Sequence, residues 1–75
     1  MARESEPAIY RITLEGYLDA SWSGWFGDLD ITHDEDGNTV LTGPIRDQSA
    51  LHGILARVRD MNLTLLAVAQ IKESK

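Results

Sequence analysis

The stretch that decides the fold runs from Gly43 to Ile71 and reads GPIRDQSALHGILARVRDMNLTLLAVAQI. Asp47 is a good helix N-cap, and Asn62 suits the left-handed conformation that ends a helix. Between them an apolar stripe recurs at the i, i+3, i+4 and i+7 spacing of an amphipathic helix, at Leu51, Ile54, Leu55 and Val58. The segment 63–71 is apolar on both faces of a strand, which predicts a final strand that is covered on both faces.

Three further strands are predicted upstream of this helix. Residues 8–18 alternate with period two, and their apolar face holds Tyr10, Ile12, Leu14 and Leu18. A second strand is predicted from Leu29 to His33 and a third from Thr39 to Thr42, joined through the hairpin signal Asp36-Gly37. Gly43-Pro44 is expected to break the third strand.

The connector at residues 19–27 reads DASWSGWFG and predicts a turn or two of helix capped by Asp19 or Ser21. Trp22, Trp25 and Phe26 would then share one face at i, i+3 and i+4. We expect these aromatics to replace a longer helix in the core. The alternative is that they line a pocket for a flat or apolar ligand, with Tyr17, His33 and Asp19 as its polar groups.

The order strand, short helix, strand, strand, helix, strand predicts an α+β fold of the ferredoxin-like βαββαβ plan. We expect a four-stranded antiparallel or mixed sheet, with the first and third strands central and parallel. The short first helix and the long second helix would cover one face. The other face would carry Thr13, Thr64, Leu66 and Val68, with Tyr17 as a further candidate, and would be covered by a second copy in a two-fold dimer.

Length and composition limit what the chain can do. Its 75 residues make one domain, which we place at residues 8–71, with a disordered tail at 1–7 and a frayed end at 72–75. A core of this size is marginal on its own, and the lack of cysteine excludes disulfides and thiolate metal sites. Self-association is therefore the expected supplement.

Charge argues against two classes of partner. The net charge is −5, and no Lys or Arg stands between Arg11 and Arg46. Nucleic acids and anionic membranes both require cations, so neither is an expected partner. The N-terminal residues lack the apolar core of a signal peptide, and no apolar run approaches the length of a membrane span. We therefore expect a soluble cytoplasmic protein.

The acidic run from Asp34 to Asn38 resembles a calcium loop only superficially. Its glycine comes too early for an EF-hand, and Ile45 occupies the twelfth position where a bidentate Glu is needed. A tight hairpin explains the same residues. Neither a metal nor a cofactor is expected.

The two histidines, His33 and His52, lack the spacing of a metal site and are expected to be structural, with His33 on the inward face of its strand. If one acts in catalysis, the pair to test is His52 with Asp47, because a carboxylate can orient an imidazole for proton transfer. No nucleophile motif or phosphate-binding glycine loop is present.

Two functional hypotheses follow. The first is a non-enzymatic homodimeric module that binds a protein partner or a small apolar ligand. The second is a small cofactor-free enzyme of the dimeric α+β barrel type, with His52 or His33 as proton shuttle.

Three strings carry a family resemblance: LEGxLDxxWxxWF, ITHxxDGxTxLxGP and DQxALHGxLxRxRD. With them the chain, from Tyr10 to about Val68, resembles a family of small stand-alone bacterial proteins that have no assigned activity. Asn62 stands where that family would have Gly, and both residues tolerate the left-handed conformation. A looser likeness, of element order alone, is to dimeric ACT-type ligand-binding modules.

Overall fold

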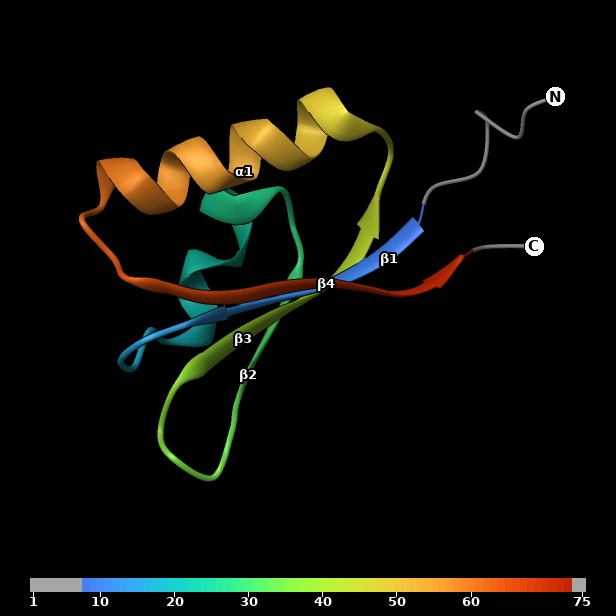
Figure 1. Ribbon diagram of the computed structural model, residues 1–75. Coiled ribbons are helices and arrows are strands. Elements are labelled where there is room, and N and C mark those ends of the chain that lie inside the picture. Colours follow the sequence, from blue (N-terminus) through green and yellow to red (C-terminus); the bar gives the residue numbers. More distant parts are fainter. Residues whose placement is uncertain (1–7, 74–75) are drawn as a thin grey trace, which may run out of the picture.

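The computed structural model describes residues 8–73 and contains a four-stranded sheet with one α-helix packed on one face (Figure 1). The strands are β1 (Ala8–Leu14), β2 (Asp30–His33), β3 (Thr39–Ile45) and β4 (Leu65–Glu73). The helices are the 3-10 helix η1 (Ala20–Phe26) and the α-helix α1 (Gln48–Asp60). The predicted tail at residues 1–7 lies outside the described residues, as do residues 74–75.

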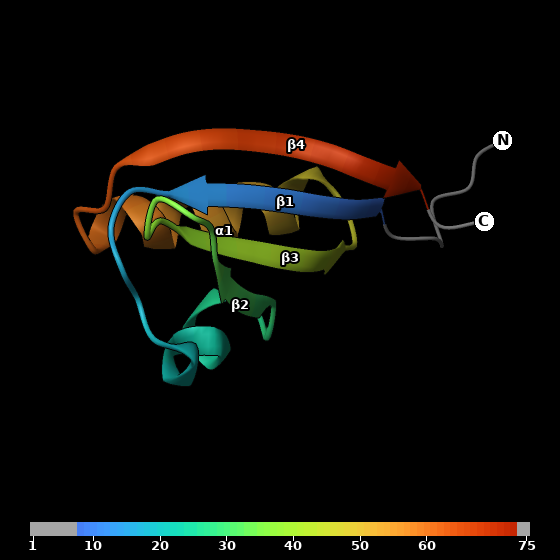
Figure 2. The same ribbon diagram turned by 90° about the horizontal axis from the view of Figure 1, so that it is seen from below.

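The sheet has the strand order β2-β3-β1-β4, and every neighbouring pair is antiparallel (Figure 2). The first and third strands, β1 and β3, are central as predicted. They are antiparallel, however, and the prediction that they are parallel is wrong. The connection through η1 returns the chain parallel to β1, and the β2–β3 hairpin then reverses it. β1 and β2 are the parallel strands, with β3 between them.

The ends of β1 and β3 differ from the sequence prediction. β1 ends at Leu14 rather than at residue 18, and Gly16 follows with a φ of 95° that L side chains rarely adopt. β3 continues through Gly43-Pro44 to Ile45, where the sequence predicts a break. Pro44 is tolerated because β2 pairs with β3 only as far as Thr42, so the remainder of β3 has a free side.

Gly43 fits this position for a second reason, which is close packing. A Cβ there would lie 2.8 Å from Cδ2 of Leu29, a core residue. The missing side chain therefore lets Leu29 pack against β3.

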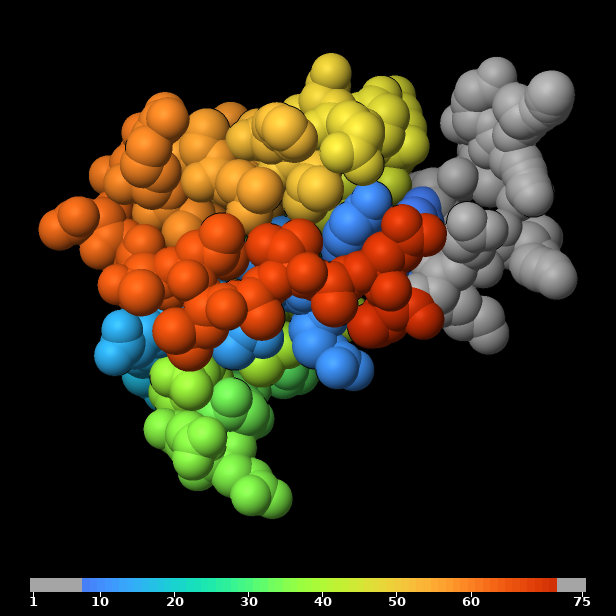
Figure 3. All heavy atoms as spheres, viewed as in Figure 1, coloured from blue at the N-terminus to red at the C-terminus, as the bar shows by residue number. Residues whose placement is uncertain are grey.

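The last strand departs most from the prediction. β4 lies at the edge of the sheet, and its side chains from Leu65 to Ile71 are exposed rather than covered on both faces (Figure 3). β4 runs to Glu73, so residues 72 and 73, which the sequence analysis assigned to a frayed end, belong to the strand. Its apolar character reflects an uncovered edge, which periodicity alone cannot distinguish from a buried strand.

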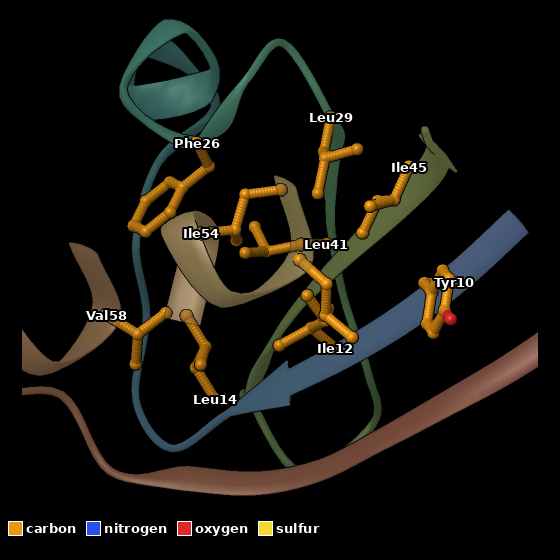
Figure 4. Packing of buried hydrophobic residues seen from close by; sticks show 10 residues of the cluster. Tyr10, Ile12, Leu14, Phe26, Leu29, Leu41, Ile45, Ile54 and Val58 are labelled. Atoms are coloured by element: carbon orange, nitrogen blue, oxygen red, sulfur yellow. The ribbon is translucent and has the colours of Figure 1, made fainter. Parts of the chain in front are cut away.

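The core lies between the sheet and the two helices (Figure 4). It comprises Tyr10, Ile12, Leu14, Phe26, Leu29, Leu41, Ile45, Leu51, Ile54 and Val58. α1 begins at the predicted cap, where the Asp47 carboxylate accepts a hydrogen bond from the Ala50 N–H at 2.8 Å. It ends before Asn62, whose φ of 61° confirms the predicted left-handed position.

Candidate functional site

The connector aromatics do not share one face. Phe26 is fully buried, whereas the side chains of Trp22 and Trp25 are 41% and 39% exposed. The reason is the helix type, because a 3-10 helix has three residues per turn and sets Phe26 about 120° from Trp22 and Trp25. Phe26 alone replaces the longer helix in the core, and the predicted aromatic pocket does not form as a unit.

Tyr17 and His33 form a separate exposed cluster. Their rings stack with centroids 4.2 Å apart and planes within 9°. The His33 Nε2 lies 2.8 Å from the Leu18 carbonyl oxygen, which can only accept, so Nε2 carries the proton. His33 pairs with buried Thr39 and so lies on the predicted inward face, but it is exposed because the end of β2 projects away from α1 (Figure 1).

Asp19 caps η1 next to this cluster. Its carboxylate accepts hydrogen bonds from the Ser21 hydroxyl and the Ser21 backbone N–H. These bonds, the one from the hydroxyl above all, lower the pKa of Asp19, and the nearby imidazole of His33 lowers it further. Asp19 is thus a structural cap.

His52 and Asp47 do not form the pair considered for catalysis. His52 is exposed on α1, and the Asp47 carboxylate is engaged in capping that helix. Among residues 8–73, no group of three or more His, Asp and Glu side chains has a geometry that could hold a metal ion.

A cleft opens between η1, α1 and the end of β3, with a volume of about 410 Å³. The four lining residues that come from α1 lie on one side of that helix, at the spacing i, i+3, i+4 and i+7. They are Ala50, Gly53, Ile54 and Arg57. The lining residues are Gly24, Trp25, Gly27, Pro44, Ile45, Arg46, Ala50, Gly53, Ile54 and Arg57. Of the aromatic pocket residues predicted from sequence, Trp25 is the one that lines this cleft.

Arg57 on α1 and Trp25 on η1, which both line the cleft, are in contact with each other. The Arg57 Cζ lies over the Trp25 ring, 4.8 Å from its centroid, which is a cation–π contact. The sequence analysis gave Arg46, Gly53 and Arg57 no role in a site. The sequence does contain one signal for this side of the cleft, because Ala50, Gly53 and Arg57 form a second strip along the helix, beside its apolar stripe.

The exposed edge of β4 is the second notable surface. Four large apolar side chains of this strand are 38–48% exposed, namely Leu65, Leu66, Val68 and Ile71. Two bulges, at Leu66 and at Ile71, interrupt the pairing of β4 with β1 and leave a regular stretch at residues 67–70.

The predicted interface residues do not all lie on one face of the sheet. Val68 pairs with buried Ile12, so it lies on the face that α1 covers, whereas Thr13 pairs with Ala67 on the open face. The bulge at Leu66 causes this difference, because one extra residue reverses the alternation of the strand. Thr64 precedes β4, and its carbonyl accepts a hydrogen bond from the Glu15 N–H.

The fold and these surfaces define a small α+β protein with an open antiparallel sheet, an exposed apolar edge at β4 and a cleft between η1 and α1. Residues 9–69 match the family model described as Domain of unknown function (DUF8691), and the chain belongs to that family. No curated protein and no solved structure matches the chain. Among the described residues, no helix is both long and apolar enough to cross a membrane.

Proposed function

We propose that this protein is a non-enzymatic module of the ferredoxin-like plan that works as a homodimer, and that two copies join through the edge of β4. The strand order and the two crossover connections support the ferredoxin-like plan. The observation that carries the dimer is the row of exposed apolar side chains on β4, at Leu65, Leu66, Val68 and Ile71.

The backbone of β4 gives the second argument. One side of the strand pairs with β1, and the other side faces no strand of the described sheet. An uncovered edge with apolar side chains is a ready template for pairing with another chain wherever charge, proline or a bulge does not blunt it, and residues 67–70 lie between the two bulges. The segment 64–71 contains neither a charged residue nor a proline.

Self-pairing suits this segment better than pairing with a charged partner. A two-fold axis near Val68 would set the regular stretch 67–70 antiparallel to its copy. No like charges would then meet across the axis, because this stretch is uncharged. The two bulges limit the paired region to its centre, which fixes the register of the dimer.

A proton-shuttle enzyme and a binder of small apolar molecules receive less support from the geometry. His33 and His52 are both exposed and neither lines the cleft, so no observation favours a proton shuttle. The separation of Phe26 from Trp22 and Trp25 removes the basis for the small apolar ligand. A cytoplasmic location remains a prediction.

Light scattering on three single variants tests the dimer. Leu66→Asp and Val68→Asp place a charge at the proposed edge and should weaken association at least tenfold, since the carboxylates would be desolvated and would repel each other across the axis. The matched control is Thr42→Asp, which puts the same charge on the open sheet face. It should leave the dimer intact.

Two results would contradict this proposal. A wild-type chain that stays monomeric at high concentration removes the dimer altogether. The second is a dimer that survives Val68→Asp but dissociates in Thr42→Asp. Such a dimer would join through the open faces of the two sheets, as the sequence analysis predicted, and not through the edges of β4.

A further inference from the structure

We propose that the cleft between η1 and α1 binds a small organic anion, in which a flat ring carries a carboxylate or a phosphate group. This site lies apart from β4, since no residue of that strand lines the cleft. The proposal therefore does not depend on the homodimer. The ligand proposed here is charged, whereas the alternative drawn from sequence was a flat or apolar ligand.

The charge of the lining is the first argument. The whole chain has 12 acidic residues against 7 Lys and Arg, yet the cleft is lined by Arg46 and Arg57 and by no Asp or Glu. The cleft is therefore a cationic site on an acidic protein. Such a reversal of charge favours anions over cations and neutral molecules.

The availability of these arginines is the second argument. In the part of the chain that the structure describes, the one ion pair joins Arg59 and Asp60, at 3.6 Å. Neither arginine of the cleft is thus neutralised by a described carboxylate. Two acidic residues lie next to lining residues of the cleft, and neither forms an ion pair with Arg46 or Arg57. The Asp47 carboxylate accepts the Ala50 N–H as the helix cap, and the Asp28 carboxylate lies near Gly24.

A contact with Trp25 positions Arg57 at the cleft. Its guanidinium carbon lies over the face of Trp25, and a cation–π contact with a ring face uses no hydrogen-bond acceptor, so N–H donors of Arg57 stay available to a ligand. A guanidinium fixed in this way loses less side-chain freedom when it binds a carboxylate or phosphate in the bidentate manner.

The size and apolar lining indicate the rest of the ligand. A volume of about 410 Å³ falls within the range of small-molecule sites. Trp25, Pro44 and Ala50 offer apolar surface next to the arginines. Gly53 leaves the wall of α1 open, because a Cβ there would meet no atom within 4 Å. A ring thus fits beside its own anionic group.

Titration with three probes, followed by NMR at the indole N–H of Trp25 and the Nε–H of Arg57, tests the proposal. Phenyl phosphate and benzoate should both give saturable shifts. Benzyl alcohol, which lacks the charge, should bind at least about tenfold more weakly than either anion. Tighter binding of phenyl phosphate assigns the site to phosphate esters, and tighter binding of benzoate assigns it to carboxylates.

Three variants separate the cleft from the general surface charge. Arg57→Gln should weaken both anions about tenfold, while Arg59→Gln, on the same helix but outside the cleft, should leave their affinity unchanged. Gly53→Leu should abolish binding by filling the open space. It should also raise the stability of α1, since glycine is a poor helix former, so unfolding cannot explain the loss.

The proposal is overturned if neither anion gives a saturable shift, or if benzyl alcohol binds as tightly as the anions. Equal losses in Arg57→Gln and Arg59→Gln would also overturn it, because they would reduce the effect to net charge. The oligomeric state of each variant, measured in parallel, keeps a failure of the dimer separate from a failure of the cleft.

Discussion

Thr39 is the one buried polar side chain among the residues that the structure describes. Its hydroxyl donates a hydrogen bond to the Gly16 carbonyl at 2.7 Å and accepts one from the Leu18 N–H at 2.8 Å. These two bonds hold the irregular segment after β1 against the start of β3. A single hydroxyl therefore fixes the point where the chain leaves the sheet for η1.

Thr39→Val should lower the free energy of unfolding by about 1–3 kcal/mol, because the backbone of the connector loses both partners while the side-chain volume is kept. Urea unfolding at a fixed protein concentration measures the change. The control is Thr42→Val, on the open face of the same strand, which should stay within about 0.5 kcal/mol. Equal effects in the two variants would show that the Thr39 bonds contribute nothing specific.

Asp34 organises the turn between β2 and β3, and hydrogen bonds lower its pKa below the ordinary value of 3.8. The backbone N–H of Asn38 is the main cause, and the N–H of Asp36 adds to it. Because the folded pKa is depressed, the resulting stability is present above the unfolded pKa and is lost as pH falls through the folded pKa.

The stability difference between wild type and Asp34→Asn should therefore be constant near neutral pH and shrink in acid, below about pH 4. Urea midpoints measured for both proteins from neutral to acidic pH give this difference. A difference that grows in acid would contradict the assignment. An NMR titration that places the Asp34 pKa at or above its ordinary value would also do so.

At the scale of elements, η1 is attached to the core through one ring. Phe26 is fully buried and Trp22 is 41% exposed, although both are aromatic residues of the same 3-10 helix. Helix type decides this difference, because three residues per turn separate positions that an α-helix would align. The attachment of η1 therefore depends on Phe26.

Phe26→Leu should reduce the free energy of unfolding by about 1–2 kcal/mol, through lost apolar contact and a residual cavity. Trp22→Leu, the same replacement in the same helix, should change it by no more than about 0.5 kcal/mol. Thermal and urea unfolding compare the two variants. A larger loss in Trp22→Leu would mean that Trp22 is covered in solution, for example by a second copy.

Element prediction succeeded where the signal is local. Asp47, Asn62 and the stripe of Leu51, Ile54 and Val58 fixed the helix, because caps and periodicity depend on neighbouring residues. It failed for β4, because a strand that is apolar on both faces can be either central or an uncovered edge. The bulges in β4 were also invisible, since they arise from pairing with β1.

The whole molecule supplies a second measure of the proposed dimer. A homodimer gains stability with protein concentration, so the thermal midpoint of the wild type should rise on concentration, and that of Val68→Asp should not. A midpoint independent of concentration in both proteins would contradict association, whatever the light scattering shows. The exposed β4 of Figure 3 is the surface that this measurement probes.

The candidate sites were predictable only in part. The sequence singled out Trp25, Leu66 and Val68, which the structure places in the cleft and on the exposed edge. It did not bring Arg46 and Arg57 together with Trp25, because residues from the end of β3, α1 and η1 meet only after the chain has folded. Thr13 was grouped with Val68 because regular alternation was assumed for β4.

The sequence by itself determined the order of elements, the helix with both of its ends, and the apolar faces that β1 and this helix turn to the core. These follow from short-range propensities, caps and periodicity, which each segment carries alone. Only the tertiary structure decided which strand lies uncovered at the edge and which arginines line a cleft. Both depend on strand pairing and packing between distant segments, and no local pattern records those contacts.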